Sequence, residues 1–164
     1  MKVKEIMIEN TTACTLASNL AEAAWLMWDN DCEILPVVAQ GGKVVGLITD
    51  RDICIVAAIK GRALSNIAVK GAFSGKVYSC ERDDDVRTAL NTMRENKVRR
   101  LAVVGQDGTL EGILSMNDIV LRAQEAANKN APELSYSEVV TIYKAICARP
   151  LPRQQQTQRM TAGA

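Results

Sequence analysis

A hydroxyl residue followed three places later by an aspartate occurs twice in the chain, as Thr49 with Asp52 and as Ser115 with Asp118. At the start of a helix such a pair is a cap, because the hydroxyl accepts a backbone N–H and the carboxylate complements the helix dipole. The same groups could bind a ligand. A helix N-terminus attracts phosphate, and a carboxylate with two free oxygens can accept both hydroxyls of a ribose. Periodicity favours the cap, whereas the duplication of the pair favours the ligand.

Both pairs lie in a long internal repeat whose copies are 66 residues apart. The segment 46–52 returns as 112–118, and the register continues without a gap far beyond it. Identical residues at this spacing include Val3/Val69, Cys14/Cys80, Ala23/Ala89, Met27/Met93, Leu35/Leu101, Val37/Val103, Gly46/Gly112 and Asp52/Asp118. Every segment is therefore interpreted as one of two copies.

The two copies predict the same elements. Residues 20–30 and 86–96 have apolar side chains at helical spacing, with Ser18 as the candidate N-cap of the first helix. Two apolar runs joined by turn residues then predict a hairpin in each copy. A helix follows each hairpin, over 50–60 in the first copy and 116–128 in the second.

One copy is too small to bury its sheet and its helices, but two copies packed together can do so. The sequence thus predicts an α/β (α+β) fold of two pseudo-symmetric β-α-β-β-α units packed through their sheets, with equivalent clefts where they meet. The first unit covers 1–66 and the second 67–128.

The remaining segment, 129–164, predicts a C-terminal helix and a disordered tail. Ser135 and Glu138 have the spacing of a capping box, and an apolar stripe follows them. The stripe predicts packing on the same domain or on a dimer partner, and it consists of Val139, Ile142, Tyr143 and Ile146. The glutamine-rich end, 153–164, is predicted to be disordered.

Composition excludes several classes of function. The net charge of +1 gives no electrostatic case for nucleic acid or a membrane as partner, and no apolar stretch is long enough for a membrane span. The start of the chain does not resemble a signal peptide. Five widely spaced cysteines and no histidine predict reduced core thiols in the cytoplasm, and they argue against a metal site or an enzyme. Trp25 and Trp28 are three residues apart, so we expect one in the core and one exposed for dimer contact.

The repeat resembles a tandem pair of cystathionine-β-synthase (CBS) domains. The resemblance rests on Leu35-Pro36-Val37-Val38 followed by Gly46-Leu47-Ile48-Thr49-Asp50-Arg51-Asp52, and it covers about residues 1–128. The second copy, Arg99-Arg100-Leu101-Ala102-Val103-Val104, has alanine where the family often has proline. The resemblance implies a disc-like pair called a Bateman module, which commonly dimerises. Such modules commonly bind AMP, ADP, ATP or S-adenosylmethionine, carry out no chemistry, and regulate an attached or interacting protein. Because this sequence contains no catalytic domain, the resemblance implies a stand-alone sensor.

The resemblance also assigns site residues, with each cleft completed by the other repeat. One cleft would use Thr49, Asp52, Leu47, Tyr78, Val98 and Arg99. The other would use Ser115, Asp118, Ile113, Thr12, Cys32 and Glu33, with Arg100 reaching phosphate from its own repeat. Guanidinium groups suit phosphate, whereas Glu33 would repel it, so we expect unequal sites.

Two interpretations remain open. In the first, an adenosyl ligand in one or both clefts shifts the geometry of a homodimer and so signals to a partner protein. In the second, the clefts bind nothing and the chain is a dimerisation or interaction scaffold. An enzyme is disfavoured, because no nucleophile–base pair is evident.

Overall fold

The structure is a computed structural model that describes residues 1–73, 75–125 and 133–148. Strands and α-helices follow in the order β1 (Ile8–Glu9), β2 (Cys14–Thr15), α1 (Leu20–Asp29), β3 (Ile34–Val38), β4 (Val44–Thr49), α2 (Asp50–Lys60), β5 (Ser79–Cys80), α3 (Val86–Asn96), β6 (Arg100–Val104), β7 (Leu110–Ser115), α4 (Met116–Arg122) and α5 (Tyr136–Cys147). None of the helices in these ranges is long and apolar enough to cross a membrane. The predicted disordered tail, 153–164, lies outside the described residues.

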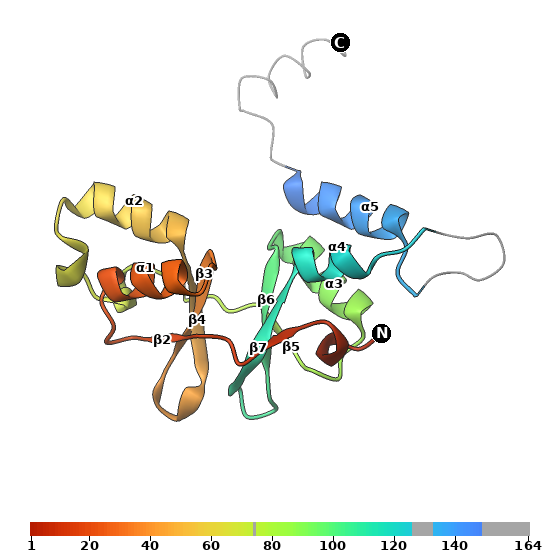
Figure 1. Ribbon diagram of the computed structural model, residues 1–164, viewed down its shortest axis with the longest axis horizontal. Coiled ribbons are helices and arrows are strands. Elements are labelled where there is room, and N and C mark those ends of the chain that lie inside the picture. Colours follow the sequence, from red (N-terminus) through yellow and green to blue (C-terminus); the bar gives the residue numbers. More distant parts are fainter. Residues whose placement is uncertain (74, 126–132, 149–164) are drawn as a thin grey trace, which may run out of the picture.

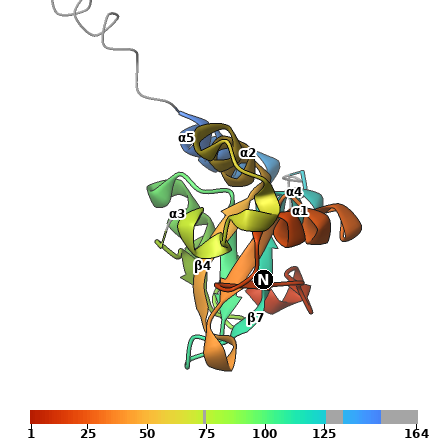
Figure 2. The same cartoon turned by 90° about the vertical axis from the view of Figure 1, so that its left-hand side faces the viewer.

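Two sheets form the centre of the molecule, one in each repeat. In the first, β2 runs parallel to β3 and β3 runs antiparallel to β4; in the second, β5, β6 and β7 repeat that arrangement. The pairing keeps the 66-residue spacing even in detail, since Cys14 lies opposite Val37 and Cys80 lies opposite Val103. The repeats lie side by side, with the hairpins of β4 and β7 pointing the same way (Figures 1 and 2). The predicted fold class and its pseudo-symmetry are confirmed.

The start of each repeat packs on the other repeat. Strand β1 extends the second sheet by pairing with β7, and the core beneath it includes Val3 and Ile6. In the same way, Ile67 and Val69 lie in the core of the first repeat. The hydrogen bonds of the two crossings are equivalent: Leu20 N–H donates to the Ile67 carbonyl at 2.9 Å, and Val86 N–H to that of Met1 at 3.1 Å. Neither repeat therefore completes its core alone.

The glycines of the repeated motif make room for these crossing segments. A Cβ atom on Gly112 would lie 2.4 Å from the carbonyl oxygen of Ile8 in β1. A Cβ atom on Gly46 would lie 2.1 Å from the ring of Phe73. Both distances are far below van der Waals contact, so a side chain at either position would displace the segment that covers it.

The helices match the prediction apart from their ends. Helix α1 is capped by Asn19 and not by Ser18, because Asn19 and Glu22 bind each other's backbone N–H in a capping box. Helix α4 ends at Arg122 and not near 128. Its continuation is replaced by backbone pairing, in which Gln124 N–H donates to the Leu134 carbonyl at 2.9 Å.

The two tryptophans contradict the prediction that one would be buried. Trp25 is 60% exposed and Trp28 is 86% exposed. Helix α1 turns Leu20, Ala23 and Met27 inward, and this buried face leaves both indoles on the outer side of the helix.

Helix α5 packs on its own chain, against α3 and α4 of the second repeat. Its buried residues are Val139, Ile142 and Ile146, whereas Tyr143 is 38% exposed and lies at the edge of the predicted stripe. The predicted capping box is half formed, because Ser135 accepts the N–H of Glu138 but the Glu138 carboxylate pairs with Arg87. That ion pair fastens α5 to α3.

Candidate functional site

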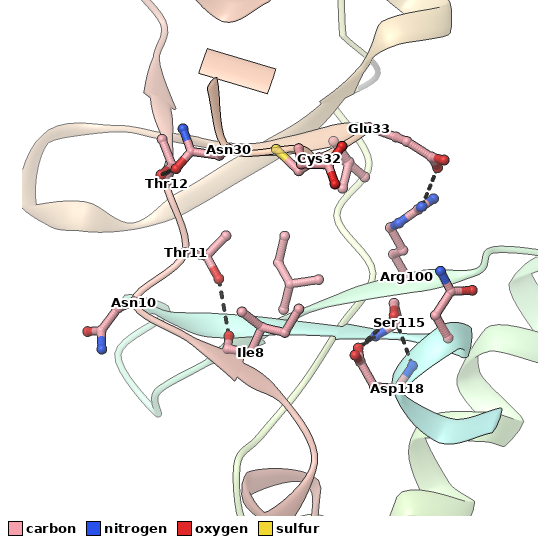
Figure 3. A pocket seen from close by; sticks show the side chains of 14 residues that line it. Ile8, Asn10, Thr11, Thr12, Asn30, Cys32, Glu33, Arg100, Ser115 and Asp118 are labelled. Carbon is pink, nitrogen blue, oxygen red and sulfur yellow. Dashed lines mark hydrogen bonds and ion pairs between the residues drawn. The ribbon is translucent and has the colours of Figure 1, made fainter. Parts of the chain in front are cut away.

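Two cavities lie between the repeats, one at each hydroxyl–aspartate pair. The Thr49 cleft has a volume of about 710 Å³ and is lined by Glu33, Ile34, Leu47, Thr49, Asp50, Arg51, Asp52, Ile55, Lys76, Tyr78, Lys97, Val98, Arg99 and Arg100. The Ser115 cleft has a volume of about 360 Å³ and is lined by Ile8, Asn10, Thr11, Thr12, Asn30, Asp31, Cys32, Glu33, Ile34, Arg100, Ile113, Ser115, Asn117 and Asp118 (Figure 3). Each cleft brings together all the site residues predicted for it.

The hydroxyl–aspartate pairs form closed capping boxes at the N-termini of α2 and α4. Thr49 Oγ1 donates to Asp52 Oδ2 at 2.7 Å and accepts the Asp52 N–H at 3.1 Å. Ser115 and Asp118 repeat this geometry at 2.6 and 3.3 Å. The strand that precedes each box fixes the hydroxyl residue in an extended conformation, as an N-cap requires. The capping role of both pairs is thus present in the structure.

The same geometry corrects one detail of the predicted ligand chemistry. Oδ2 of Asp52 accepts both the hydroxyl and the N–H of Thr49, and Oδ2 of Asp118 does the same with Ser115. Within the described residues, only Oδ1 of each carboxylate is without a hydrogen bond. Each aspartate therefore has one oxygen free to accept further hydrogen bonds and not the two that the predicted ribose contact used, because the other belongs to the cap.

Arg100 and Glu33 form an ion pair across the boundary between the repeats. Figure 3 shows the two side chains reaching toward each other from opposite walls of the Ser115 cleft. Both residues also line the Thr49 cleft, so the pair separates the two cavities. The guanidinium that the resemblance assigned to phosphate is therefore already paired with a carboxylate.

Cys32 supplies a neutral wall of the Ser115 cleft. Burial raises the pKa of its thiol, while the Ile34 backbone and Arg100 act in the opposite direction. The thiol therefore stays protonated at neutral pH and presents a small, weakly polar surface. Among the described residues, no group of three or more histidine, cysteine, aspartate or glutamate side chains could hold a metal ion.

Several lining residues were not predicted from the sequence. In the Thr49 cleft they include Arg51, Lys76 and Lys97, and in the Ser115 cleft they include Asn10 and Asp31. The repeat contains a signal for them, because Asn10 and Lys76 are 66 residues apart, as are Asp31 and Lys97. Extending the predicted cleft by two positions along the register would have found both pairs.

Comparisons with known proteins agree with this architecture. The CBS domain family matches the chain twice, over residues 3–58 and 69–125. The uncharacterized protein YlbB of Bacillus subtilis is 32% identical over 124 residues, which cover 75% of this chain and 82% of YlbB.

Two solved structures share the fold. The CBS domain pair of protein MJ0100, in complex with 5′-methylthioadenosine and S-adenosyl-L-methionine, aligns with a TM-score of 0.67 at 23% identity and covers 74% of this chain and 98% of its own. The protein CBSX2, in complex with AMP, aligns with a TM-score of 0.64 at 22% identity and covers 73% and 93%. At these identities the likeness establishes the fold.

Proposed function

The chain belongs to the CBS domain family, of which it carries two copies, and on that premise we propose that it is a regulatory module that binds an adenosyl ligand between its repeats. The bound state is passed to a partner protein, and the module itself carries out no reaction. The observation that carries this proposal is the construction of the clefts. Each combines a hydroxyl–aspartate box from one repeat with side chains from the other.

A ligand in such a cleft contacts both repeats at once. In the Thr49 cleft, Oδ1 of Asp52 accepts a ribose hydroxyl, the base packs on Leu47, Tyr78 and Val98, and Arg99 faces the phosphates. The Ser115 cleft offers Asp118 for the ribose and a wall formed by Ile113, Thr12 and Cys32. Binding then favours one arrangement of the repeats over others, which is the differential affinity that a population shift needs.

Protein relatives with adenosyl ligands support the choice of ligand class. MJ0100 was solved with 5′-methylthioadenosine and S-adenosylmethionine, and CBSX2 with AMP. We place the module in the cytoplasm, because all five cysteines are free thiols and such thiols suit a reducing compartment.

Isothermal titration calorimetry with AMP, ADP, ATP, S-adenosylmethionine and 5′-methylthioadenosine tests the proposal. At least one ligand should bind, and Asp52→Ala or Asp118→Ala should weaken it by roughly tenfold or more, since a hydrogen bond to a charged group is lost. Asp29→Ala is the matched control, because Asp29 is exposed on α1 and lines neither cleft. Absence of heat with all five ligands would refute the proposal.

A homodimeric scaffold is the second candidate function, and exposed apolar side chains favour it. Trp28 on α1 is 86% exposed, Ile59 on α2 is 78% exposed and Leu121 on α4 is 82% exposed. Trp25 lies beside Trp28 on the outer side of α1 and is 60% exposed, and large exposed apolar side chains that lie together are typical of protein contacts. Sedimentation equilibrium should show a dimer that Trp28→Ser weakens. A monomer at all concentrations would exclude the scaffold.

A further inference from the structure

The two clefts differ in charge at four positions that the repeat makes equivalent. Arg51, Lys76, Lys97 and Arg99 line the Thr49 cleft. The residues 66 places away, which line the Ser115 cleft, are Asn117, Asn10, Asp31 and Glu33. A cation is absent from the second cleft at all four positions, and at two of them a carboxylate replaces it. The aspartate of the capping box is retained in both.

The formal charges of the two linings are therefore opposite. Five cationic side chains and three carboxylates line the Thr49 cleft, which gives +2. One cation and three carboxylates line the Ser115 cleft, which gives −2. That one cation, Arg100, is paired with Glu33. Clefts lined by one sign of charge raise the local concentration of ligands of the other sign.

The cations of the Thr49 cleft are placed to meet an anion. Arg99 is exposed and makes no ion pair within the described residues. Lys76 Nζ lies over the ring of Tyr78, 4.9 Å from its centroid, which holds the ammonium beside the cavity. This cleft is also the larger, at about 710 Å³ against about 360 Å³, so it has room for a phosphate chain as well as a nucleoside.

We infer that the two clefts select adenosyl ligands by charge. The Thr49 cleft takes a polyphosphorylated adenosine, whose charge Arg99, Lys97 and Lys76 neutralise. The Ser115 cleft rejects phosphates and takes an adenosyl ligand without them, neutral or cationic at its 5′ end. This inference rests on the proposed function, since it assigns ligands to the same two clefts.

Exchanging charges between equivalent positions tests the inference by calorimetry, with ATP and 5′-methylthioadenosine as probes. The variant Lys97→Asp/Arg99→Glu gives the Thr49 cleft the net charge of its counterpart, and Asp31→Lys/Glu33→Arg gives the Ser115 cleft a positive lining. Because Glu33 also lines the Thr49 cleft, a new ATP site in the second variant is assigned to the Ser115 cleft by its loss in Asp118→Ala. Positions 31 and 97 share a left-handed backbone, with φ of 47° and 54°, so each tolerates the other's residue. Because Lys97 also donates to the Ala148 carbonyl, thermal melting verifies that the first variant folds. Arg62→Glu/Lys70→Glu changes net charge equally at exposed positions outside both clefts.

In the wild-type chain ATP should occupy one site, which Asp52→Ala removes and Asp118→Ala leaves. Lys97→Asp/Arg99→Glu should weaken ATP by roughly ten- to a hundredfold and leave 5′-methylthioadenosine unchanged, because only the phosphates lose partners. Asp31→Lys/Glu33→Arg should create a second ATP site. Raising the salt concentration should weaken ATP far more than 5′-methylthioadenosine.

Three results would overturn charge selection while the proposed function stands. They are ATP binding that Lys97→Asp/Arg99→Glu leaves unchanged, ATP binding that falls equally in the Arg62→Glu/Lys70→Glu control, and ATP binding that depends on Asp118. Absence of binding of both probes to all forms would overturn charge selection for these ligand classes. The proposed function would be refuted only if AMP, ADP and S-adenosylmethionine also failed to bind.

Discussion

The two repeats differ in what packs against their outer helices. On the second repeat, α5 lies against α3 and α4, and its Val139 and Ile142 join the core that contains Met93 and Ile119. On the first repeat, the equivalent residues Met27 and Ile53 line a groove of about 590 Å³ between α1 and α2. Figure 1 shows α5 above the second repeat and no such helix above the first among the described elements.

The same contrast holds in the clefts, where the boxes are equal and the surrounding charges are opposite. Strand pairing, motif glycines and capping boxes agree between the copies because each is needed to close a core or end a strand. Side chains at the rims of the clefts neither close a core nor end a strand, so the residue types at these positions can differ between the copies. Pseudo-symmetry here describes the framework, and the proposed ligand selection rests on the departures from it.

We expect the largest effect from removing a buried side chain of α5, the helix that packs on the second repeat. Ile142→Ala on α5 should lower the free energy of unfolding by about 2–4 kcal/mol, because truncating this buried side chain leaves a cavity. Urea denaturation followed by circular dichroism measures the change. Val140→Ala is the control on the same helix, since Val140 is 56% exposed and should cost no more than about 0.5 kcal/mol. Equal losses would mean that α5 is peripheral and that the repeats differ less than their structures suggest.

The next largest effect distinguishes the two motif glycines, Gly46 and Gly112, by the cost in stability of replacing each with alanine. Gly112→Ala should cost about 1–3 kcal/mol, because the new Cβ meets the backbone of β1, which cannot rotate away. The atoms nearest to a Cβ on Gly46 belong to the ring of Phe73, so a second substitution, Phe73→Leu, should recover part of the loss. A double-mutant cycle in urea measures the coupling. Additive effects of Gly46→Ala and Phe73→Leu would contradict the assigned contact.

The equivalent thiols Cys14 and Cys80 should make stability fall at alkaline pH. Burial raises the pKa of Cys14 to about 11; for Cys80 burial, aided by Asp84, raises it to about 12. Above the ordinary thiol pKa of 9.0 the unfolded chain releases a proton that the folded chain keeps, so each thiol removes about 1.4 kcal/mol per pH unit. The loss should end near the folded pKa of each thiol.

Urea denaturation under reducing conditions, one pH unit below and one above 9.0, measures this loss. The variants Cys14→Ala and Cys80→Ala should each remove one thiol's share of the slope. If either variant keeps the full slope, its thiol is not the group that titrates.

The smallest effect concerns the ion pair that fastens α5. Arg87 Nε lies 2.8 Å from Glu138 Oε1, and both side chains are partly exposed. Exposed pairs contribute little, so a double-mutant cycle with Arg87→Met and Glu138→Gln should give a coupling of about 0.5 kcal/mol. A coupling near zero would mean that the ion pair does not contribute to holding α5 on α3. The first repeat has Ala21 at the equivalent position and offers no such pair.

The sequence was sufficient to predict the features that depend on local pattern or on the repeat. Helix α3 begins and ends as its apolar spacing predicts, and residues of both clefts assemble as the resemblance predicts. Contacts between distant segments that the repeat does not imply were not predictable, because no local pattern encodes them. The end of α4 depends on pairing with the chain before α5, and the exposure of Trp25 depends on which face of α1 the sheet covers.

The crossing of β1 onto the second sheet has a consequence for synthesis. A chain emerging from the ribosome presents β1 well before its partner Gly112, which lies in β7, the last strand of the second hairpin. Until then Val3, Ile6 and the edge of β1 have nowhere to dock, whereas Phe73, which covers the first repeat, emerges before β6 and β7. The first repeat therefore has its cover available first, and the second repeat completes its sheet only when β7 can pair with β1.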